Sequence, residues 1–147
     1  MKKLIQYFLL LSLMLGCSSV KTPAAQVAFK FMDAYYVQVD PRAALPFTDR
    51  LAFEKVKQSV DLTQTISQEQ PGMNQQAKAK ISYKLLPNES NDQEGLFVFE
   101  VKIHPEKSSE MTRKTMVRVR LSENPQEKDM WKVTQFMDQD TTSSPKN

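Results

Sequence analysis

Leu96-Phe97-Val98-Phe99-Glu100-Val101-Lys102-Ile103-His104 is the stretch that decides the fold of this chain of 147 residues. Large apolar side chains occupy every second position, at Phe97, Phe99, Val101 and Ile103. Successive side chains of a β-strand point to opposite faces, so this alternation predicts a strand with one face on a core and the other toward water. We therefore place a half-buried strand at residues 96–104.

Three other segments alternate in the same way, at residues 77–85, 114–121 and 130–137. The last of them is less regular, and its expected apolar side holds Val133 and Met137. Connections of five to ten residues between these segments favour antiparallel neighbours over helical crossovers. The sequence thus predicts three or four antiparallel strands.

Helices are expected before the strands. Thr22-Pro23 supplies a hydroxyl cap followed by proline at the first helical position, and apolar residues recur at helical spacing over residues 27–35. Asp40-Pro41 repeats the start signal for about one turn, and a third helix is predicted over residues 49–60. The polar segment that follows is expected to hold a short strand at residues 62–66.

Helices followed by a run of strands indicate the two-layer α+β class, in which the apolar side of the helices covers one face of the sheet. The predicted domain spans residues 23–138, a length that suits one hydrophobic core. Residues 139–147 are polar and are expected to form a disordered tail.

The N-terminus resembles a secretory signal. Lys2 and Lys3 precede an apolar run over residues 4–15, and Gly16 stands before Cys17, the only cysteine of the chain. This resembles the lipobox of bacterial lipoproteins, although Met14 and Leu15 depart from its usual residues. The resemblance implies that residues 1–16 are a signal peptide and that Cys17 receives acyl chains such as palmitate.

Two other interpretations of the N-terminus stay open: an uncleaved anchor and a secreted protein with a free thiol. Residues 4–15 are shorter than the ~20 residues that span a bilayer. The lipobox interpretation makes residues 17–22 a lipidated cysteine with a short tether, so the domain would lie close to the bilayer. Ser18 and Ser19, with no Asp after the cysteine, resemble the pattern that sorts lipoproteins to the periplasmic face of the outer membrane.

Composition and motifs exclude several classes of function. Without Lys2 and Lys3 the net charge falls from +3 to +1, unlike the strongly basic balance of nucleic-acid-binding proteins. One histidine and no free thiol argue against a metal site. No glycine-rich phosphate loop and no Gly-x-Ser-x-Gly elbow is present, so we expect no cofactor and no nucleophilic catalysis.

The element order also resembles the nuclear transport factor two-like superfamily. The resembling stretches are Thr22-Pro23-Ala24-Ala25-Gln26-Val27-Ala28-Phe29-Lys30-Phe31-Met32-Asp33-Ala34-Tyr35-Tyr36, then Asp40-Pro41-Arg42-Ala43-Ala44 and Trp131-Lys132-Val133. The resemblance implies a cone-like fold in which a curved sheet wraps around the first helix, with a pocket at the wide end. It looks especially like small bacterial lipoproteins of this fold with no assigned role.

Enzymes of that superfamily place Asp, His or Tyr in the pocket, and the resemblance makes Asp33, Tyr36, Asp40 and His104 the candidate pocket residues. A buried carboxylate beside tyrosines could have a raised pKa and transfer protons. The alternative assigns Tyr35 to the core, leaves Tyr36 half-exposed, makes Asp40 a helix cap and exposes His104. No catalytic motif of the superfamily can be transferred to this chain.

The polar side of the strands carries a candidate basic patch, formed by Lys78, Lys80, Lys84, Lys102, Lys114, Arg118 and Arg120. If the strands are neighbours, these side chains share one face and could meet acidic lipid headgroups, an anionic polymer or an acidic protein. The alternative is an ordinary solvated face that discourages aggregation.

The sequence therefore predicts a membrane-anchored envelope lipoprotein whose noncatalytic domain binds a partner protein or a small ligand. Two other classes stay open: a small metal-free enzyme of the isomerase or hydratase type, and a module that dimerises through its sheet.

Overall fold

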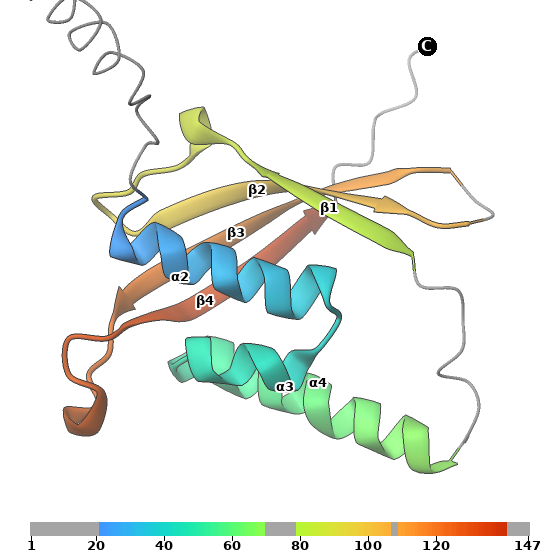
Figure 1. Cartoon of the computed structure of the whole chain (residues 1–147), viewed down its shortest axis with the longest axis horizontal. Helices are drawn as coiled ribbons and strands as arrows, with labels where there is room; N and C mark the ends of the chain where they lie inside the picture. Colours follow the sequence, from blue (N-terminus) through green and yellow to red (C-terminus); the bar gives the residue numbers. More distant parts are fainter. Residues whose placement is uncertain (1–20, 70–78, 107–108, 141–147) are drawn as a thin grey trace, which may run out of the picture.

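A computed structural model of the chain describes residues 21–69, 79–106 and 109–140 (Figure 1). The predicted signal peptide, Cys17, Lys78 and residues 141–147 lie outside the described residues. The described chain forms helices on one side of a four-stranded antiparallel sheet. This confirms the predicted α+β class, with helices first and strands after them.

The first helix begins where the sequence predicts. Helix α2 spans Pro23–Met32, and the Thr22 hydroxyl accepts a hydrogen bond from the Ala25 amide at 3.2 Å. The helix continues as a π-helical turn, η2, at Asp33–Val37. Ala28 and Phe31 are fully buried, so this helix supplies one side of the core.

Two short elements and a long helix follow. Helix α3 spans Pro41–Ala44, the 3₁₀ turn η3 spans Leu45–Phe47, and helix α4 spans Arg50–Glu69. Helix α4 packs against α3 and against the last strand. It therefore lies beside one edge of the sheet, away from its centre (Figure 1).

The prediction of a short strand at residues 62–66 is wrong, because helix α4 continues through this segment. No proline or glycine interrupts the helix before Pro71, and an established helix can add residues without further apolar contacts. Within this helix the hydroxyls of Thr63 and Thr65 donate to backbone carbonyls four residues earlier, at 2.8 and 3.0 Å, so both hydroxyls have partners inside the helix. Residues 61–65 are exposed, which explains the missing apolar pattern.

The sheet contains β1 (Lys80–Leu85), β2 (Leu96–His104), β3 (Met111–Leu121) and β4 (Trp131–Asp140). The strands lie in the order β1-β2-β3-β4, each antiparallel to the next, and the sheet is not closed. Strand β4 ends at Asp140, so residues 139 and 140 belong to the sheet and not to the tail. Two 3₁₀ turns, η5 (Pro87–Glu89) and η6 (Pro125–Glu127), lie in the connections.

A β-bulge in β4 changes which side chains face the core. Val119 pairs with Val133, whereas Arg118 pairs with Gln135, so Thr134 is the extra residue. Beyond the bulge the phase is reversed: Phe136 is buried, and Met137 is 45% exposed. The prediction that Met137 shares the apolar side with Val133 is therefore wrong.

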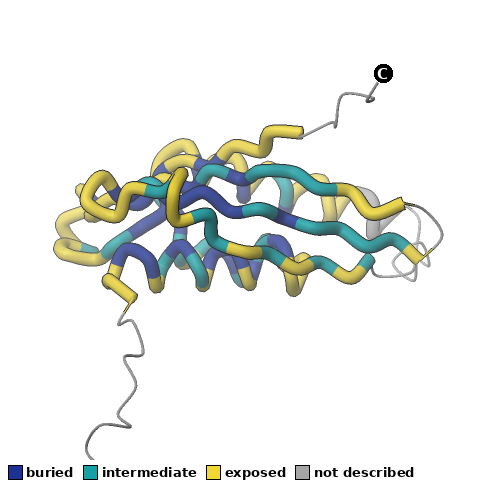
Figure 2. The backbone as a smooth tube through the Cα atoms, turned by 90° about the horizontal axis from the view of Figure 1, so that it is seen from above, coloured by how far each residue is buried: buried dark blue, intermediate teal, exposed yellow. Residues whose placement is uncertain are grey.

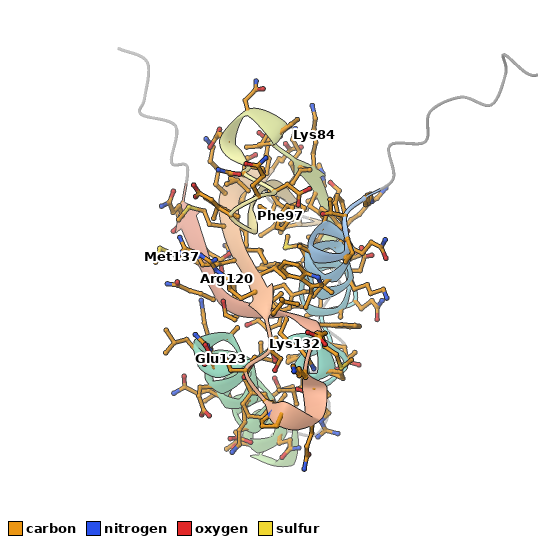
Figure 3. The ribbon with its side chains drawn as sticks, turned by 90° about the vertical axis from the view of Figure 1, so that its left-hand side faces the viewer. Lys84, Phe97, Arg120, Glu123, Lys132 and Met137 are labelled. Carbon is orange, nitrogen blue, oxygen red and sulfur yellow. The ribbon has the colours of Figure 1, made fainter. Side chains whose placement is uncertain are left out.

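The core lies between α2 and the sheet. Phe31 of α2 and Phe99 of β2 are fully buried there, together with Val101, Val117 and Val119. Figure 2 shows the buried residues where the strands lie over the helices, while the turns at both ends are exposed. In Figure 3, Phe97 lies between the sheet and α2, whereas Met137 lies on the opposite side. That opposite side is called the outer face below.

Candidate functional site

Two of the four candidate pocket residues hold η2 against the sheet. The Tyr83 hydroxyl of β1 donates to Asp33 Oδ1 at 2.7 Å, and the Tyr36 hydroxyl donates to Asp138 Oδ1 of β4 at 2.6 Å. Asp33 and Tyr36 are thus joined to strands at opposite edges of the sheet. Each makes its own tyrosine–aspartate pair, and together the two pairs fix η2 between β1 and β4.

Both phenols in these pairs favour the protonated state. Burial raises the pKa of Tyr36 well above its ordinary value, and the Asp138 carboxylate raises it further. Burial also raises the pKa of Tyr83, with a further contribution from Asp33. At neutral pH the two tyrosines are therefore hydrogen-bond donors, which suits a structural role.

The other two candidates lie elsewhere. Asp40 caps α3, because its Oδ1 accepts from the amides of Arg42 and Ala43 at 3.0 and 3.2 Å. It also borders a hollow of about 480 Å³ between α3 and α4. His104 lies at the end of β2, where its Nδ1 is 3.1 Å from Glu110 Oε2. The structure does not bring the four candidates together in one pocket.

The basic residues do share one face, as the strand register shows. On the outer face Lys80 pairs with His104, Lys84 with Glu100, Glu100 with Lys114, and Lys102 with Thr112. Arg118 and Arg120 continue the same side of β3, because they stand two and four positions beyond Met116. The described members of the candidate basic patch therefore lie on one face of the sheet.

Much of this face is neutralised by carboxylates. Lys114 Nζ lies 2.6 Å from Glu89 Oε1, and Lys102 Nζ lies 3.3 Å from Glu110. Glu100 also stands directly across from Lys84 in the sheet. The positive charge is thus reduced at Lys102 and Lys114, whereas Lys80 and Lys84 of β1 and the two arginines at the end of β3 form no ion pair with a described residue.

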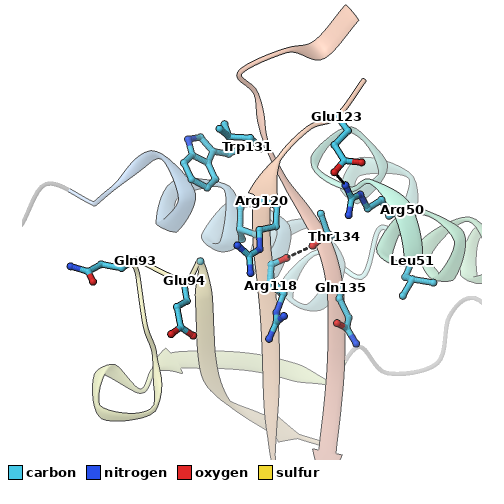
Figure 4. Close-up of a pocket in the computed structure, with 13 residues that line it drawn as sticks. Arg50, Leu51, Gln93, Glu94, Arg118, Arg120, Glu123, Trp131, Thr134 and Gln135 are labelled. Carbon is cyan, nitrogen blue, oxygen red and sulfur yellow. Dashed lines mark hydrogen bonds and ion pairs between the residues drawn. The ribbon is translucent and has the colours of Figure 1, made fainter. Parts of the chain in front are cut away.

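The end of β3 forms the floor of a hollow of about 690 Å³, which we call the arginine hollow (Figure 4). Its lining residues come from five segments of the chain: Arg50, Leu51, Gln93, Glu94, Gly95, Arg118, Val119, Arg120, Leu121, Glu123, Trp131, Thr134 and Gln135. Strands β3 and β4 provide the floor, the turn before β2 provides one wall, and the start of α4 provides the other.

The charges of the arginine hollow are unevenly paired. Arg50 forms an ion pair with Glu123. Arg118 and Arg120 are both exposed, and neither forms an ion pair with any described residue. Glu94 lies on the opposite wall, so two unpaired guanidinium groups face one carboxylate (Figure 4). The hollow therefore carries a net positive charge available to a ligand.

Two backbone features shape the hollow. Gly95 has φ +63°, and a Cβ at this position would lie 2.2 Å from the Val119 carbonyl oxygen. Only glycine allows the turn to approach β3 this closely, and the Val119 amide donates to the Gly95 carbonyl at 2.7 Å. On the other side the bulge at Thr134 sets Gln135 opposite Arg118, and the Thr134 hydroxyl donates to the Arg118 carbonyl at 3.4 Å (Figure 4).

Sequence reasoning identified the two arginines but not the rest of this site. Gly95, Trp131 and Gln135 are far apart in the sequence, and no local pattern joins them. Lys132 was also missed: its side chain is almost fully buried, and Nζ donates to the Pro46 carbonyl and to Glu127, both at 2.8 Å (Figure 3). It holds η3 and η6 to the beginning of β4.

The described residues contain no helix long and apolar enough to cross a bilayer, and no cluster of three or more potential metal ligands. Comparison with known proteins found no matching family model, no matching curated protein and no matching solved structure.

Proposed function

We propose that this chain is a noncatalytic binding domain, held at a membrane by acyl chains on Cys17, which binds an anionic group of a partner or ligand in the arginine hollow. The observation that carries the proposal is the pair Arg118 and Arg120, which project without carboxylate partners into a hollow of about 690 Å³. The proposal does not include the enzyme alternative, because its four candidate residues lie in separate surroundings.

Guanidinium groups suit this role physically. Each can donate two parallel hydrogen bonds to one carboxylate or phosphate, and such charge-assisted bonds are about twice as strong as neutral ones. A concave site lowers the competition from water compared with a flat surface. Glu94 would weaken binding of a plain anion, so it favours a ligand that also offers a hydrogen-bond donor.

The membrane attachment is supported by the N-terminal sequence alone. Lys2 and Lys3, the apolar run and Gly16-Cys17 together resemble a lipoprotein signal, and two or more acyl chains would make attachment stable. We place the domain at the periplasmic face of the outer membrane on the same basis. The order of helices before an antiparallel sheet supports, at a coarse level, the resemblance to the nuclear transport factor two-like superfamily.

The fluorescence of a tryptophan in the arginine hollow can be used to measure ligand binding. Trp131 is the single tryptophan of the chain and lines the arginine hollow, so its fluorescence should report occupancy. Full-length protein in neutral phosphatidylcholine nanodiscs would be titrated with oligoglutamate. We expect a saturable change in Trp131 emission that weakens as salt is added, because the arginines are exposed to screening.

Charge reversal separates the hollow from the general charge of the sheet. Replacing both arginines (R118E with R120E) should lower the affinity at least about tenfold. The matched control reverses Lys80 and Lys84, which change the net charge equally but lie on β1. The proposal fails if oligoglutamate leaves Trp131 unchanged, or if the two double variants lose affinity to the same extent.

A further inference from the structure

The arginine hollow continues into a narrow groove on the outer face. This groove has a volume of about 160 Å³ and is lined by Leu96, Met116 and Met137, together with Arg118 and Gln135. Arg118 and Gln135 also line the arginine hollow, so the two depressions adjoin. We call the smaller one the methionine groove. A basic site and an apolar site thus lie side by side.

Three of the residues that line the two depressions stand at alternate positions of a single strand, β3. Met116, Arg118 and Arg120 stand at alternate positions of β3 and share its outer face. Side chains two residues apart in a strand lie roughly 6.6–7 Å from one another. An extended peptide laid over β3 has the same repeat, so its alternate side chains could meet these three residues in turn.

We propose that the occupant of this surface is an extended segment of a partner protein with one apolar and two acidic side chains at alternate positions. The pattern is apolar-x-acid-x-acid, in either chain direction. The carboxylates would meet Arg118 and Arg120, and the apolar side chain would enter the methionine groove. This inference rests on the function proposed above and specifies its ligand.

Charge complementarity selects this occupant. Among the described basic residues of the outer face, Lys80, Lys84, Arg118 and Arg120 form no ion pair, but of these four only the two arginines line a described hollow. A membrane surface would favour basic residues spread over the whole face. A second copy of the same face would bring four unpaired arginines into one interface, which disfavours self-association.

Methionine suits the apolar position of such a site. Its unbranched, polarisable side chain adapts to different apolar partners, and Met137 is 45% exposed in the absence of one. The bulge at Thr134 is what directs Met137 to the outer face, since the unbroken alternation of β4 would have turned it to the core. The same backbone irregularity therefore builds both depressions.

The test compares two peptides of identical composition. The first has leucine at position one and glutamate at positions three and five, with serines between them; the second places the two glutamates next to each other. Both would be titrated into full-length protein in neutral nanodiscs with Trp131 emission as the readout. The alternating peptide should bind on the order of tenfold more tightly than its isomer.

A methionine variant identifies the apolar contact. M137S should weaken the alternating peptide about tenfold and leave oligoglutamate binding unchanged. The control is M111S: Met111 is 50% exposed but lies at the other end of β3, outside both depressions. Circular dichroism of both variants would verify that each retains the fold.

The outcomes separate this inference from the proposed function. If both peptides bind equally and M137S has no effect, the ligand pattern is refuted while the anion site stands. If neither peptide nor oligoglutamate binds, both proposals fall. The inference is also overturned if nanodiscs containing phosphatidylglycerol change Trp131 emission while the alternating peptide does not, or if the surface instead supports self-association that R118E abolishes.

Discussion

Among the residues that line the arginine hollow, Gly95 is the one least able to tolerate substitution. Its positive φ is costly for other residues, and any side chain would collide with the backbone of Val119. Gly95→Ala should therefore lower the free energy of unfolding by about 2–3 kcal/mol. Urea denaturation measures this, and Gln93→Ala in the same turn is the control, with an expected change within about 0.5 kcal/mol. Equal stability of the two variants would contradict the described turn.

Tyr36 makes stability depend on alkaline pH. Its folded-state pKa lies above the unfolded value of about 10, so its contribution is complete below pH 10 and is lost as the pH rises through the folded pKa. Tyr36→Phe should lower stability by about 1 kcal/mol at neutral pH, because the hydrogen bond to Asp138 is lost. It should also flatten the decline in stability above pH 10. Parallel pH profiles of the two proteins would refute this role.

At the scale of elements, the bulge in β4 determines which of the neighbours Phe136 and Met137 is buried in the core. Phe136 is buried, with its ring 5.0 Å from that of Phe31, whereas Met137 is half-exposed on the outer face. Phe136→Ala should cost about 3–5 kcal/mol, and Met137→Ala should change stability by less than about 0.5 kcal/mol. Thermal or urea unfolding of the pair checks the register. The reverse order of costs would show that β4 has no bulge.

The elements differ in how far the sequence predicts them. Strands β1, β2 and β3 alternate without interruption, so their apolar sides could be assigned from the pattern. The bulge at Thr134 could not, because a single extra residue looks like ordinary irregularity in one strand and becomes evident only from pairing with β3. The second half of α4 was missed for a different reason: it is exposed and therefore lacks an apolar period.

At the scale of the molecule, the site depends on the meeting of distant segments. Arg118 and Arg120 were predictable from the alternation of β3, but Lys102 and Lys114 have carboxylate partners that only the fold reveals. The four candidate pocket residues suggested by the resemblance each contact a different partner, in separate parts of the structure. Sequence patterns thus predicted the faces of the sheet, and tertiary contacts determined which charges remain available.

The proposed anchor predicts a specific covalent form. Intact mass spectrometry of protein from its membrane fraction should show a chain that begins at Cys17 and carries acyl chains. Cys17→Ala should remain unacylated and retain its N-terminal segment. An unmodified thiol on the uncleaved wild-type chain would refute the anchor, although binding at the arginine hollow could still be measured.

The central claim is that ligand binding occurs on the outer face of the sheet and not beneath the helices. Amide chemical-shift mapping of the full-length protein with the alternating peptide tests it most directly. The account predicts that the largest shifts cluster at Gly95, Met116, Arg118 and Arg120, with little change at Asp33, Tyr36 or Asp40. Shifts concentrated around those last three residues, with none at the end of β3, would contradict it.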